Sequence, residues 1–216
     1  MNTDFARRQM VAQQVRTWDV FNRDVLDVLG RVAREQFVPA GCADVAYADT
    51  EIPLAHGQVM LRPIIEGRLL QALDLDADDK VLEIGTGTGY LTACLASLSA
   101  SVTSIEIHED FVAAASKNLE TAEIGNASLH CMDAMSELPD GEFDAIAVTG
   151  SVPRIDQRFV NELKPGGRLF LVVGESPLMS ALLITRSADE DLQQKNLFET
   201  DIPALENIAE ESAFSF

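Results

Sequence analysis

Three glycines at alternate positions give the segment KVLEIGTGTGYLTACLA (residues 80–96) the chemistry to hold a small molecule. Gly85, Gly87 and Gly89 follow a short apolar run and precede a longer apolar stretch. Glycine tolerates a positive φ angle and leaves no Cβ between the backbone and a ligand. The pattern therefore predicts a buried strand, a tight turn that forms the floor of a cofactor site, and a helix.

The spacing of these glycines narrows the choice of cofactor. In the dinucleotide fingerprint G-x-G-x-x-G the third glycine allows close helix packing, but here it comes one residue early and Tyr90 takes its place. The sequence also lacks the G-x-x-x-x-G-K-[ST] phosphate loop. Glu83 before the turn and G-x-G-x-G within it resemble the first motif of methyltransferases that use S-adenosylmethionine (SAM). The alternative is a turn that only joins a strand to a helix.

Polar residues at the ends of later predicted strands extend the candidate site. Glu106 follows Gly85 by 21 residues, and its two carboxylate oxygens could accept hydrogen bonds from both ribose hydroxyls. Asp133, after the next strand, could accept from the exocyclic amine of an adenine, although capping of the following helical turn competes with this role. Thr149 ends the strand after that and completes the set of cofactor-binding candidates.

From residue 80 onward the sequence alternates between strand and helix patterns, which is typical of a parallel sheet covered on both faces. Ligands of such sheets bind beyond the carboxyl ends of the strands, where the winding reverses. Helices are also expected earlier in the chain, at residues 5–17, 23–32 and 64–73, with an apolar loop at 46–63. The expected strands are 80–85, 101–107, 127–133, 143–150, 167–174, 181–187 and 196–202, and the later helices are 90–100, 110–122 and 158–163.

Composition excludes several classes of function. The formal net charge of −19 disfavours a nucleic-acid partner. No signal peptide and no apolar run of roughly 18 residues is present, so we expect a cytoplasmic protein without a membrane partner. The cysteines lack metal-ligand spacing, and we predict neither a disulfide nor a metal site. Cys94, Cys131 and His130 are expected to fill the core.

Five segments carry a more specific pattern: MVAQQVR (10–16), VAREQFVP (32–39), AYADTEIPLAHGQ (46–58), VLEIGTGTGY (81–90) and FDAIAVTG (143–150). Together they are similar to the protein-L-isoaspartate (D-aspartate) O-methyltransferase family, over about residues 8–175. The resemblance implies a class I methyltransferase fold of the Rossmann-like α/β type: a doubly wound, mostly parallel seven-stranded sheet with an N-terminal helical extension. It also implies SAM as cofactor and a protein or peptide substrate, whose isoaspartyl carboxylate is esterified for repair.

This resemblance suggests a division of one domain into three parts. Residues 1–75 would hold the N-terminal helices and the acceptor loop, 76–187 the SAM-binding core, and 188–216 a C-terminal strand with an acidic tail. A carboxylate acceptor is already ionised at pH 7 and requires no general base. Catalysis would therefore rest on proximity and alignment.

One loop departs from the family pattern. Where the family reads G-Q-T-I-S-Q-P, this sequence reads GQVMLRP (57–63), so Val59 and Leu61 replace the two hydroxyl residues. The resemblance places Leu61 at the position of the active-site serine. Arg62 replaces a glutamine, and its guanidinium could hold an anionic acceptor.

The changed loop leaves other functions open. One alternative is a SAM-dependent methyltransferase with a different acceptor, such as an unknown small molecule. Another is a SAM-binding protein without turnover that acts through partners. The C-terminal segment LFETDIPALENIAEESAFSF (197–216) also departs from the family pattern, and it either packs against the sheet or shapes another acceptor site.

Overall fold

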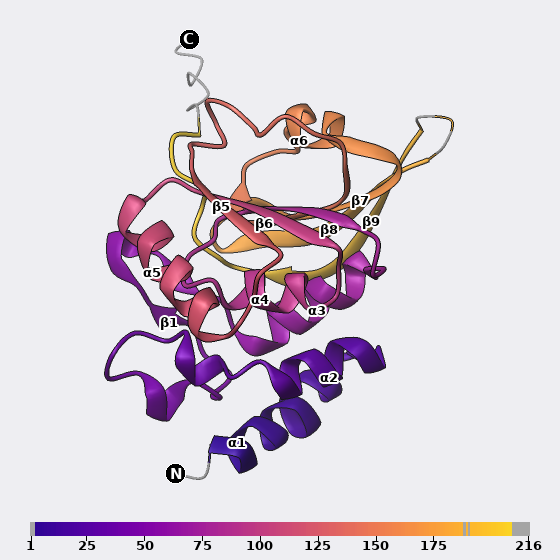
Figure 1. The fold of residues 1–216 in the computed structure, drawn as a ribbon. Helices are drawn as coiled ribbons and strands as arrows, with labels where there is room; N and C mark the ends of the chain where they lie inside the picture. Colours follow the sequence, from indigo (N-terminus) through magenta and orange to yellow (C-terminus); the bar gives the residue numbers. More distant parts are fainter. Residues whose placement is uncertain (1–2, 188, 190, 209–216) are drawn as a thin grey trace.

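A computed structural model describes residues 3–187, 189 and 191–208 of the chain. Its centre is a seven-stranded mixed sheet in the order β5-β4-β3-β6-β7-β8-β9 (Figure 1). The first five strands in that order are parallel, and β8 is antiparallel to both of its neighbours. The strands are β3 (Lys80–Ile84), β4 (Ser101–Glu106), β5 (Ala127–Cys131), β6 (Phe143–Val152), β7 (Leu163–Glu175), β8 (Leu178–Arg186) and β9 (Leu192–Thr200).

The winding of the sheet reverses at β3. The chain passes from β3 outward through β4 to β5, and then returns to the other side of β3 as β6. Ligands of open α/β sheets bind at such a reversal, beyond the carboxyl ends of the strands. The predicted Rossmann-like fold is confirmed, with the glycine turn directly after the strand at the reversal.

Helices cover the two faces of the sheet unequally. Buried residues such as Val81 and Phe170 face the larger core, which the helices before and beside the sheet complete. Their strand neighbours, such as Leu82 and Leu169, face the opposite side and pack against Phe159 of α6. The helices are α1 (Thr3–Gln9), α2 (Arg23–Arg31), α3 (Pro63–Leu73), α4 (Tyr90–Ala96), α5 (Glu109–Thr121) and α6 (Gln157–Asn161).

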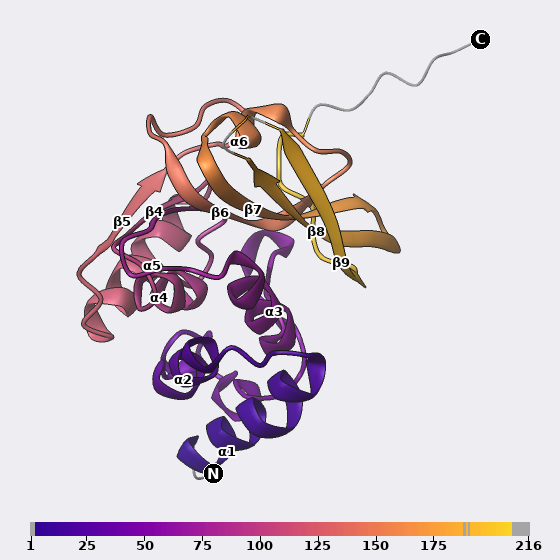
Figure 2. The ribbon, with the colours of Figure 1, turned by 90° about the vertical axis from the view of Figure 1, so that its right-hand side faces the viewer.

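The predicted N-terminal helical extension is also present. α1 continues as a π-helix (Met10–Val15) and a 3-10 turn (Arg16–Trp18), and with α2 it lies on the far side of α3 and α4 from the sheet (Figure 2). The predicted apolar loop contains a small hairpin of β1 (Ile52–Pro53) and β2 (Val59–Met60). Among the described residues, no helix has the length and apolar character needed to cross a bilayer.

Two sequence expectations about β5 are wrong. His130 and Cys131 are exposed, because β5 is the edge strand and only partly covered by α5. Cys94 is fully buried on α4, as predicted. Element ends also differ: α4 stops at Ala96, and β7 and β9 each begin four residues earlier than expected. Of the predicted acidic tail, residues 188, 190 and 209–216 lie outside the described part.

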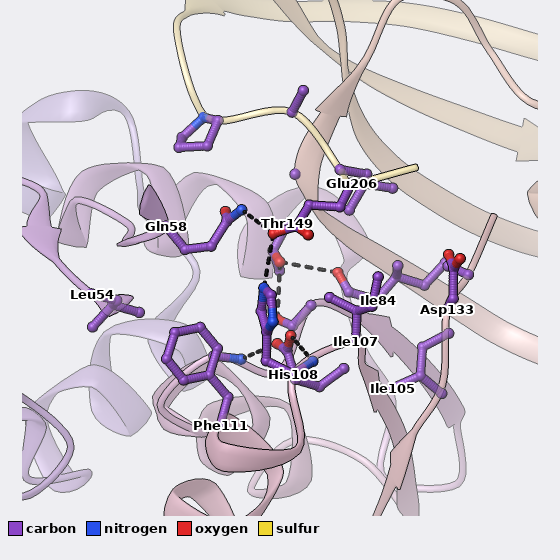
Figure 3. Close-up of a pocket in the computed structure, with 18 of the residues that line it drawn as sticks. Leu54, Gln58, Ile84, Ile105, Ile107, His108, Phe111, Asp133, Thr149 and Glu206 are labelled. Carbon is purple, nitrogen blue, oxygen red and sulfur yellow. Dashed lines mark hydrogen bonds and ion pairs between the residues drawn. The ribbon is translucent and has the colours of Figure 1, made fainter. Parts of the chain in front are cut away.

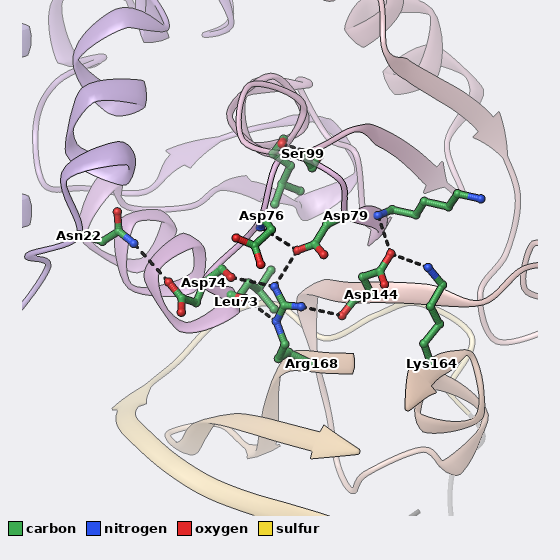
Figure 4. Close-up of polar contacts among 11 residues, drawn as sticks. Asn22, Leu73, Asp74, Asp76, Asp79, Ser99, Asp144, Lys164 and Arg168 are labelled. Atoms are coloured by element: carbon green, nitrogen blue, oxygen red, sulfur yellow. Dashed lines mark hydrogen bonds and ion pairs between the residues drawn. The ribbon is translucent and has the colours of Figure 1, made fainter. Parts of the chain in front are cut away.

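Charged side chains at the amino ends of the strands form a closed network (Figure 4). The Oδ2 atom of Asp144 accepts from the backbone N–H of Lys80 at 2.8 Å and from Lys164 Nζ at 2.7 Å. Arg168 donates to the Leu73 carbonyl through Nε and to Asp79 through Nη2, each at 2.7 Å. These groups connect the amino ends of the strands to the end of α3. The glycine turn lies at the other end of the strands.

Candidate functional site

The glycine turn has the conformation that its sequence predicts. Gly85, Gly87 and Gly89 have φ angles of 97°, 52° and 84°. A Cβ on Gly85 would lie 2.2 Å from Thr149 Oγ1, and one on Gly89 would lie 3.2 Å from the Cβ of Ala115 on α5. Packing therefore excludes a side chain at Gly85 and leaves little room for one at Gly89, while Gly85 and Gly87 contribute to the lining of a pocket.

This pocket lies at the carboxyl ends of β3, β4 and β6 (Figure 3). Its walls come from the glycine turn, the segments after β4 and β5, the end of β6 at Thr149 and Gly150, and the apolar loop before α3. Residues 203–206 complete the lining. The apolar side chains of Ile84, Ile105, Ile107 and Phe111 share this lining with the carboxylates of Glu106 and Asp133.

Glu106 is positioned by backbone N–H groups. Its side chain is nearly buried, Oε2 accepts from Gly87 N at 2.9 Å, and Oε1 accepts from His108 N at 3.1 Å. A carboxylate offers about four acceptor positions, so about two remain for a ligand. The strand end thus holds an acceptor pair beside the glycine turn, at the place where a ribose was predicted.

Asp133 lines the same pocket and also caps a turn. Its Oδ1 accepts from Met135 N at 2.8 Å, and its Oδ2 accepts from Ser136 Oγ and from Asn207 Nδ2 at 3.0 and 2.9 Å. Burial alone would raise the pKa of Asp133, but these hydrogen bonds outweigh it and lower the pKa. The capping role that competed in the sequence interpretation therefore coexists with a place in the pocket wall.

Thr149 joins β6 to the glycine turn. Its hydroxyl donates to the carbonyl oxygens of Ile84 and Gly85, at 3.0 and 2.9 Å. The same side chain occupies the space that a Cβ on Gly85 would need, and it lines the pocket. Thr149 and Gly85 are thus a matched pair that fixes the turn against the neighbouring strand.

Glu83 and Gly89, both predicted to bind the cofactor, do not line this pocket. Glu83 is fully buried behind the turn, where its Oε2 accepts from Thr92 Oγ1 at 2.5 Å and from Ser104 Oγ at 2.6 Å. Burial raises the pKa of Glu83 to about 8. The carboxyl group is therefore protonated at neutral pH and connects β3 to α4 and β4.

Leu61 reaches the pocket from the loop before α3, and a buried arginine holds its backbone. Arg34 is completely buried, donates through Nη2 to the Leu61 carbonyl at 2.5 Å, and forms an ion pair with Glu66 through Nη1. Its guanidinium lies 4.7 Å from the ring centroid of Tyr90, the first residue of α4. This contact couples the loop to the helix that follows the glycine turn.

Arg62 is not among the residues that line the pocket. Its guanidinium binds Asp49 in a bidentate arrangement, Nε to Oδ1 at 3.2 Å and Nη2 to Oδ2 at 2.5 Å. The hydrogen bonds to Asp49 raise the pKa of Arg62. The guanidinium of Arg62 therefore binds a carboxylate, as its predicted role requires, but that carboxylate belongs to the same chain.

The C-terminal segment at residues 203–207 was expected to pack against the sheet or to shape another acceptor site, but its place in the wall of this pocket was not predicted. Ala204 forms a parallel bridge with Ser151. Leu205 packs so closely on Gly150 that a Cβ at that glycine would lie 2.7 Å from Cδ2 of Leu205. Glu206 accepts from Gln58 Nε2 at 3.2 Å and lies 2.8 Å from His108 Nε2. Nothing in the sequence PALEN marks it as a pocket wall, because its partners are remote in sequence.

Comparison with known proteins decides the family. Residues 6–207 match the family described as protein-L-isoaspartate(D-aspartate) O-methyltransferase (PCMT). The chain belongs to this family. It is therefore a SAM-dependent carboxyl O-methyltransferase.

Full-length relatives support the same assignment. A protein-L-isoaspartate O-methyltransferase of Trichlorobacter lovleyi is 36% identical over 196 residues, covering 90% of each chain. One of Koribacter versatilis is 37% identical over 198 residues, covering 90% of this chain and 89% of the relative. A crystal structure of the Plasmodium falciparum family member in complex with S-adenosyl-L-homocysteine aligns with a TM-score of 0.80 at 20% identity, over 94% of this chain and 99% of that one. This last likeness concerns the fold.

The residues of the methyltransferase pocket fit SAM. Gly85 and Gly87 leave the backbone open toward the cavity, and Glu106 retains acceptor positions for hydroxyl donors. Ile105, Ile107 and Phe111 offer an apolar wall of the kind that a flat heterocycle packs against. Acceptors and apolar surface of the kind that a nucleoside requires are thus present in one cavity.

Proposed function

We propose that this methyltransferase esterifies the side-chain carboxylate of isoaspartyl residues in damaged proteins, as the names of its relatives imply. The observation that carries the proposal is that one cavity is lined both by the cofactor residues Gly85 and Glu106 and by the loop residue Leu61. Methyl donor and acceptor can therefore meet without a change of fold.

Methyl transfer to a carboxylate requires no proton transfer by the protein. When bound, SAM supplies a methyl group on a positively charged sulfur. An acceptor carboxylate with a pKa near 4 is already ionised at neutral pH, so no side chain has to remove a proton. The protein contributes by binding, by aligning the acceptor and by excluding water, which is the proximity effect expected of such a site.

We assign the cofactor contacts by position. Glu106 would accept from the ribose hydroxyls, and Asp133 would use its remaining acceptor capacity on the adenine side of the cavity. Gly85, Gly87 and Thr149 would form the floor. Glu83 and Gly89 would act indirectly by fixing the turn and its helix.

We further propose that this chain is a divergent family member, because the acceptor side of the cavity is apolar where a serine is usual. Leu61 is 7% exposed and lines the cavity together with Val59. A positioned hydroxyl contributes roughly 0.5–1.5 kcal/mol through its hydrogen bond. Leu61→Ser should therefore increase kcat/KM for an isoaspartyl peptide by about 2- to 10-fold. A decrease in a variant that still folds would mean that the apolar side chain serves the native acceptor.

The direct test is incubation with methyl-labelled SAM and matched peptides that contain isoaspartate or normal aspartate. The proposal predicts a base-labile methyl ester, which releases volatile labelled methanol on hydrolysis, from the isoaspartyl peptide alone. Cofactor binding without ester would contradict the proposed substrate. That outcome would instead favour another acceptor, for which the changed apolar loop at Val59 and Leu61 would be the reason.

A further inference from the structure

Two imidazoles and a carboxylate from two segments of the chain meet at the edge of the cofactor pocket. His56 belongs to the loop before α3, His108 follows β4, and Asp110 is in the first turn of α5. One ring nitrogen of each histidine and one oxygen of Asp110 all lie within 4.8 Å of one another. We propose that His56, His108 and Asp110 bind a divalent transition-metal ion, with Zn²⁺ as the fitting example.

One ligand pair stands at a separation that suits such an ion, and the other pairs lie within 4.8 Å. Zinc binds histidine nitrogens at about 2.0–2.1 Å and carboxylate oxygens at about 2.0–2.2 Å, so two ligands on a tetrahedral ion lie about 3.3 Å apart. The Nε2 atom of His56 lies 3.0 Å from Asp110 Oδ2, which is close to that separation. Three protein ligands leave a fourth position for water or another small ligand.

One rearrangement accompanies binding. The rings of His56 and His108 are stacked, with centroids 3.8 Å apart and an interplanar angle of 9°. Because a metal ion lies near the plane of each imidazole that binds it, one ring has to rotate out of the stack. The His56 side chain can do this, since it is 39% exposed and stands on a loop.

Surrounding charges favour a cation at this position. Nε2 of His108 lies 2.8 Å from Glu206 Oε1, and Figure 3 shows the two side chains facing each other. A carboxylate that binds the second nitrogen of a ligating imidazole orients the ring and increases its basicity. Glu106 is two residues before His108, and the whole chain has a net charge of −19. Apart from the two histidines, no basic side chain in the described part of the chain forms an ion pair with Asp110, Glu106 or Glu206.

The backbone of His56 gives an independent sign of constraint. Its φ and ψ angles are 56° and 20°, a left-handed conformation that costs a non-glycine residue about 1–2 kcal/mol. Such strain is concentrated at functional sites. The sequence predicted no metal site because His56 and Asp110 are 54 positions apart and have no ligand-spacing pattern.

A bound ion would fasten the loop that carries His56 to the start of α5, directly beside Glu106. This property goes beyond methyl transfer and does not depend on the identity of the methyl acceptor. It would link divalent metal concentration to the opening of the cofactor pocket.

The test is calorimetric titration of the full chain with Zn²⁺ in the absence of SAM. We expect one saturable site, and both His56→Ala and Asp110→Asn should weaken it at least about tenfold. Asp110 is 59% exposed at its side chain, so this second variant should fold normally, which circular dichroism can verify. Glu206→Gln should weaken binding by about 10-fold or more, as loss of such an orienting partner does.

The matched controls use the remaining ligands of the chain. His130 is the only other histidine in the sequence, and it is exposed on β5 next to Cys131. His130→Ala and Cys131→Ser should leave the Zn²⁺ affinity unchanged. The proposal is overturned if the wild-type chain shows no saturable site, if His56→Ala binds like the wild type, or if either control variant abolishes binding.

Discussion

At the amino ends of the strands, Asp79 and Asp144 are each bonded to a basic side chain, Arg168 and Lys164. At the carboxyl ends, Glu106 accepts only from backbone N–H groups. Within the described residues, Glu106 and Asp133 form no ion pair with a lysine or arginine, although the pKa of Asp133 responds to the nearby charge of Arg158. Carboxylates therefore have different partners at the amino and carboxyl ends of the strands.

This difference separates stability from binding. A carboxylate paired with arginine or lysine has its charge balanced by that partner and contributes to the folded state. A carboxylate held in place by backbone N–H groups keeps lone pairs for a ligand. Changes at the amino ends should therefore affect unfolding, whereas changes at the carboxyl ends should affect SAM or acceptor binding.

The largest effect is expected at Gly85. Gly85→Ala places a Cβ 2.2 Å from Thr149 Oγ1 at a φ of 97°, so it combines backbone strain of about 1–2 kcal/mol with overpacking of about 1–3 kcal/mol. Gly166→Ala is the matched control at the start of β7, with a φ of 85° and no heavy atom within 4 Å. Urea unfolding and SAM titration should show a greater loss of both stability and affinity for Gly85→Ala, and equal effects would contradict the packing argument.

A second substitution tests the amino ends. Arg168→Met removes the bonds to Asp79 and to the Leu73 carbonyl, and should reduce the free energy of unfolding by about 2–3 kcal/mol. Lys164→Met, which breaks a more exposed pair with Asp144, should cost less than about 1 kcal/mol. Neither variant should change the dissociation constant of SAM. A weakened SAM complex in Arg168→Met would break the separation between the two ends.

The pH dependence of unfolding probes the buried carboxyl group behind the turn. Burial raises the pKa of Glu83 to about 8 in the folded state, above its ordinary value of 4.5. Protonation of Glu83 therefore makes its full contribution to the free energy of unfolding below about pH 4.5. This contribution is lost as the pH rises to about 8, at up to about 1.4 kcal/mol per pH unit.

Glu66 behaves in the same direction, because burial outweighs Arg34 and raises its pKa to about 7. Between pH 7 and 8 most of this loss comes from Glu83, because Glu66 is already about half deprotonated at pH 7. Glu83→Gln should lose less stability than the wild type over that interval in urea unfolding experiments. Parallel slopes for the two proteins would show that Glu83 does not titrate there.

The smallest effect is expected at Arg62. Contact with an acceptor would require the acceptor carboxylate to replace that of Asp49 on the guanidinium. Because the exchange is between like groups, Arg62→Ala should raise KM for an isoaspartyl peptide less than about tenfold, with kcat and SAM affinity unchanged. Asp49→Asn, which weakens the competing pair with the Arg62 guanidinium, should lower that KM. If both variants match the wild type, Arg62 has no part in acceptor binding.

Local patterns were sufficient to predict which strand ends meet at the pocket. Positive φ angles at Gly85, Gly87 and Gly89 follow from glycine chemistry, and the positions of Glu106, Asp133 and Thr149 follow from the rule that strand ends converge. The exposure of His130 could not be predicted in this way, because it depends on which strand lies at the edge of the sheet.

Contacts between remote segments were beyond the reach of local patterns. The sequence shows an acidic residue at Glu206 but not its proximity to Gln58 and His108, which the return of the chain after β9 produces. The Arg34 contact to the Leu61 carbonyl likewise depends on the packing of the N-terminal helices. Long-range packing therefore supplied what spacing could not.

The most direct test compares one carboxylate from each end of the sheet. Calorimetric titration with S-adenosyl-L-homocysteine should detect binding to the wild type and to Asp144→Asn with equal affinity. Glu106→Gln should bind about 10- to 100-fold more weakly, the effect of losing hydrogen bonds to a charged acceptor worth roughly 1.5–3 kcal/mol. Unaltered affinity in folded Glu106→Gln, or no binding to the wild type, would contradict the placement of the cofactor at the carboxyl ends of the strands.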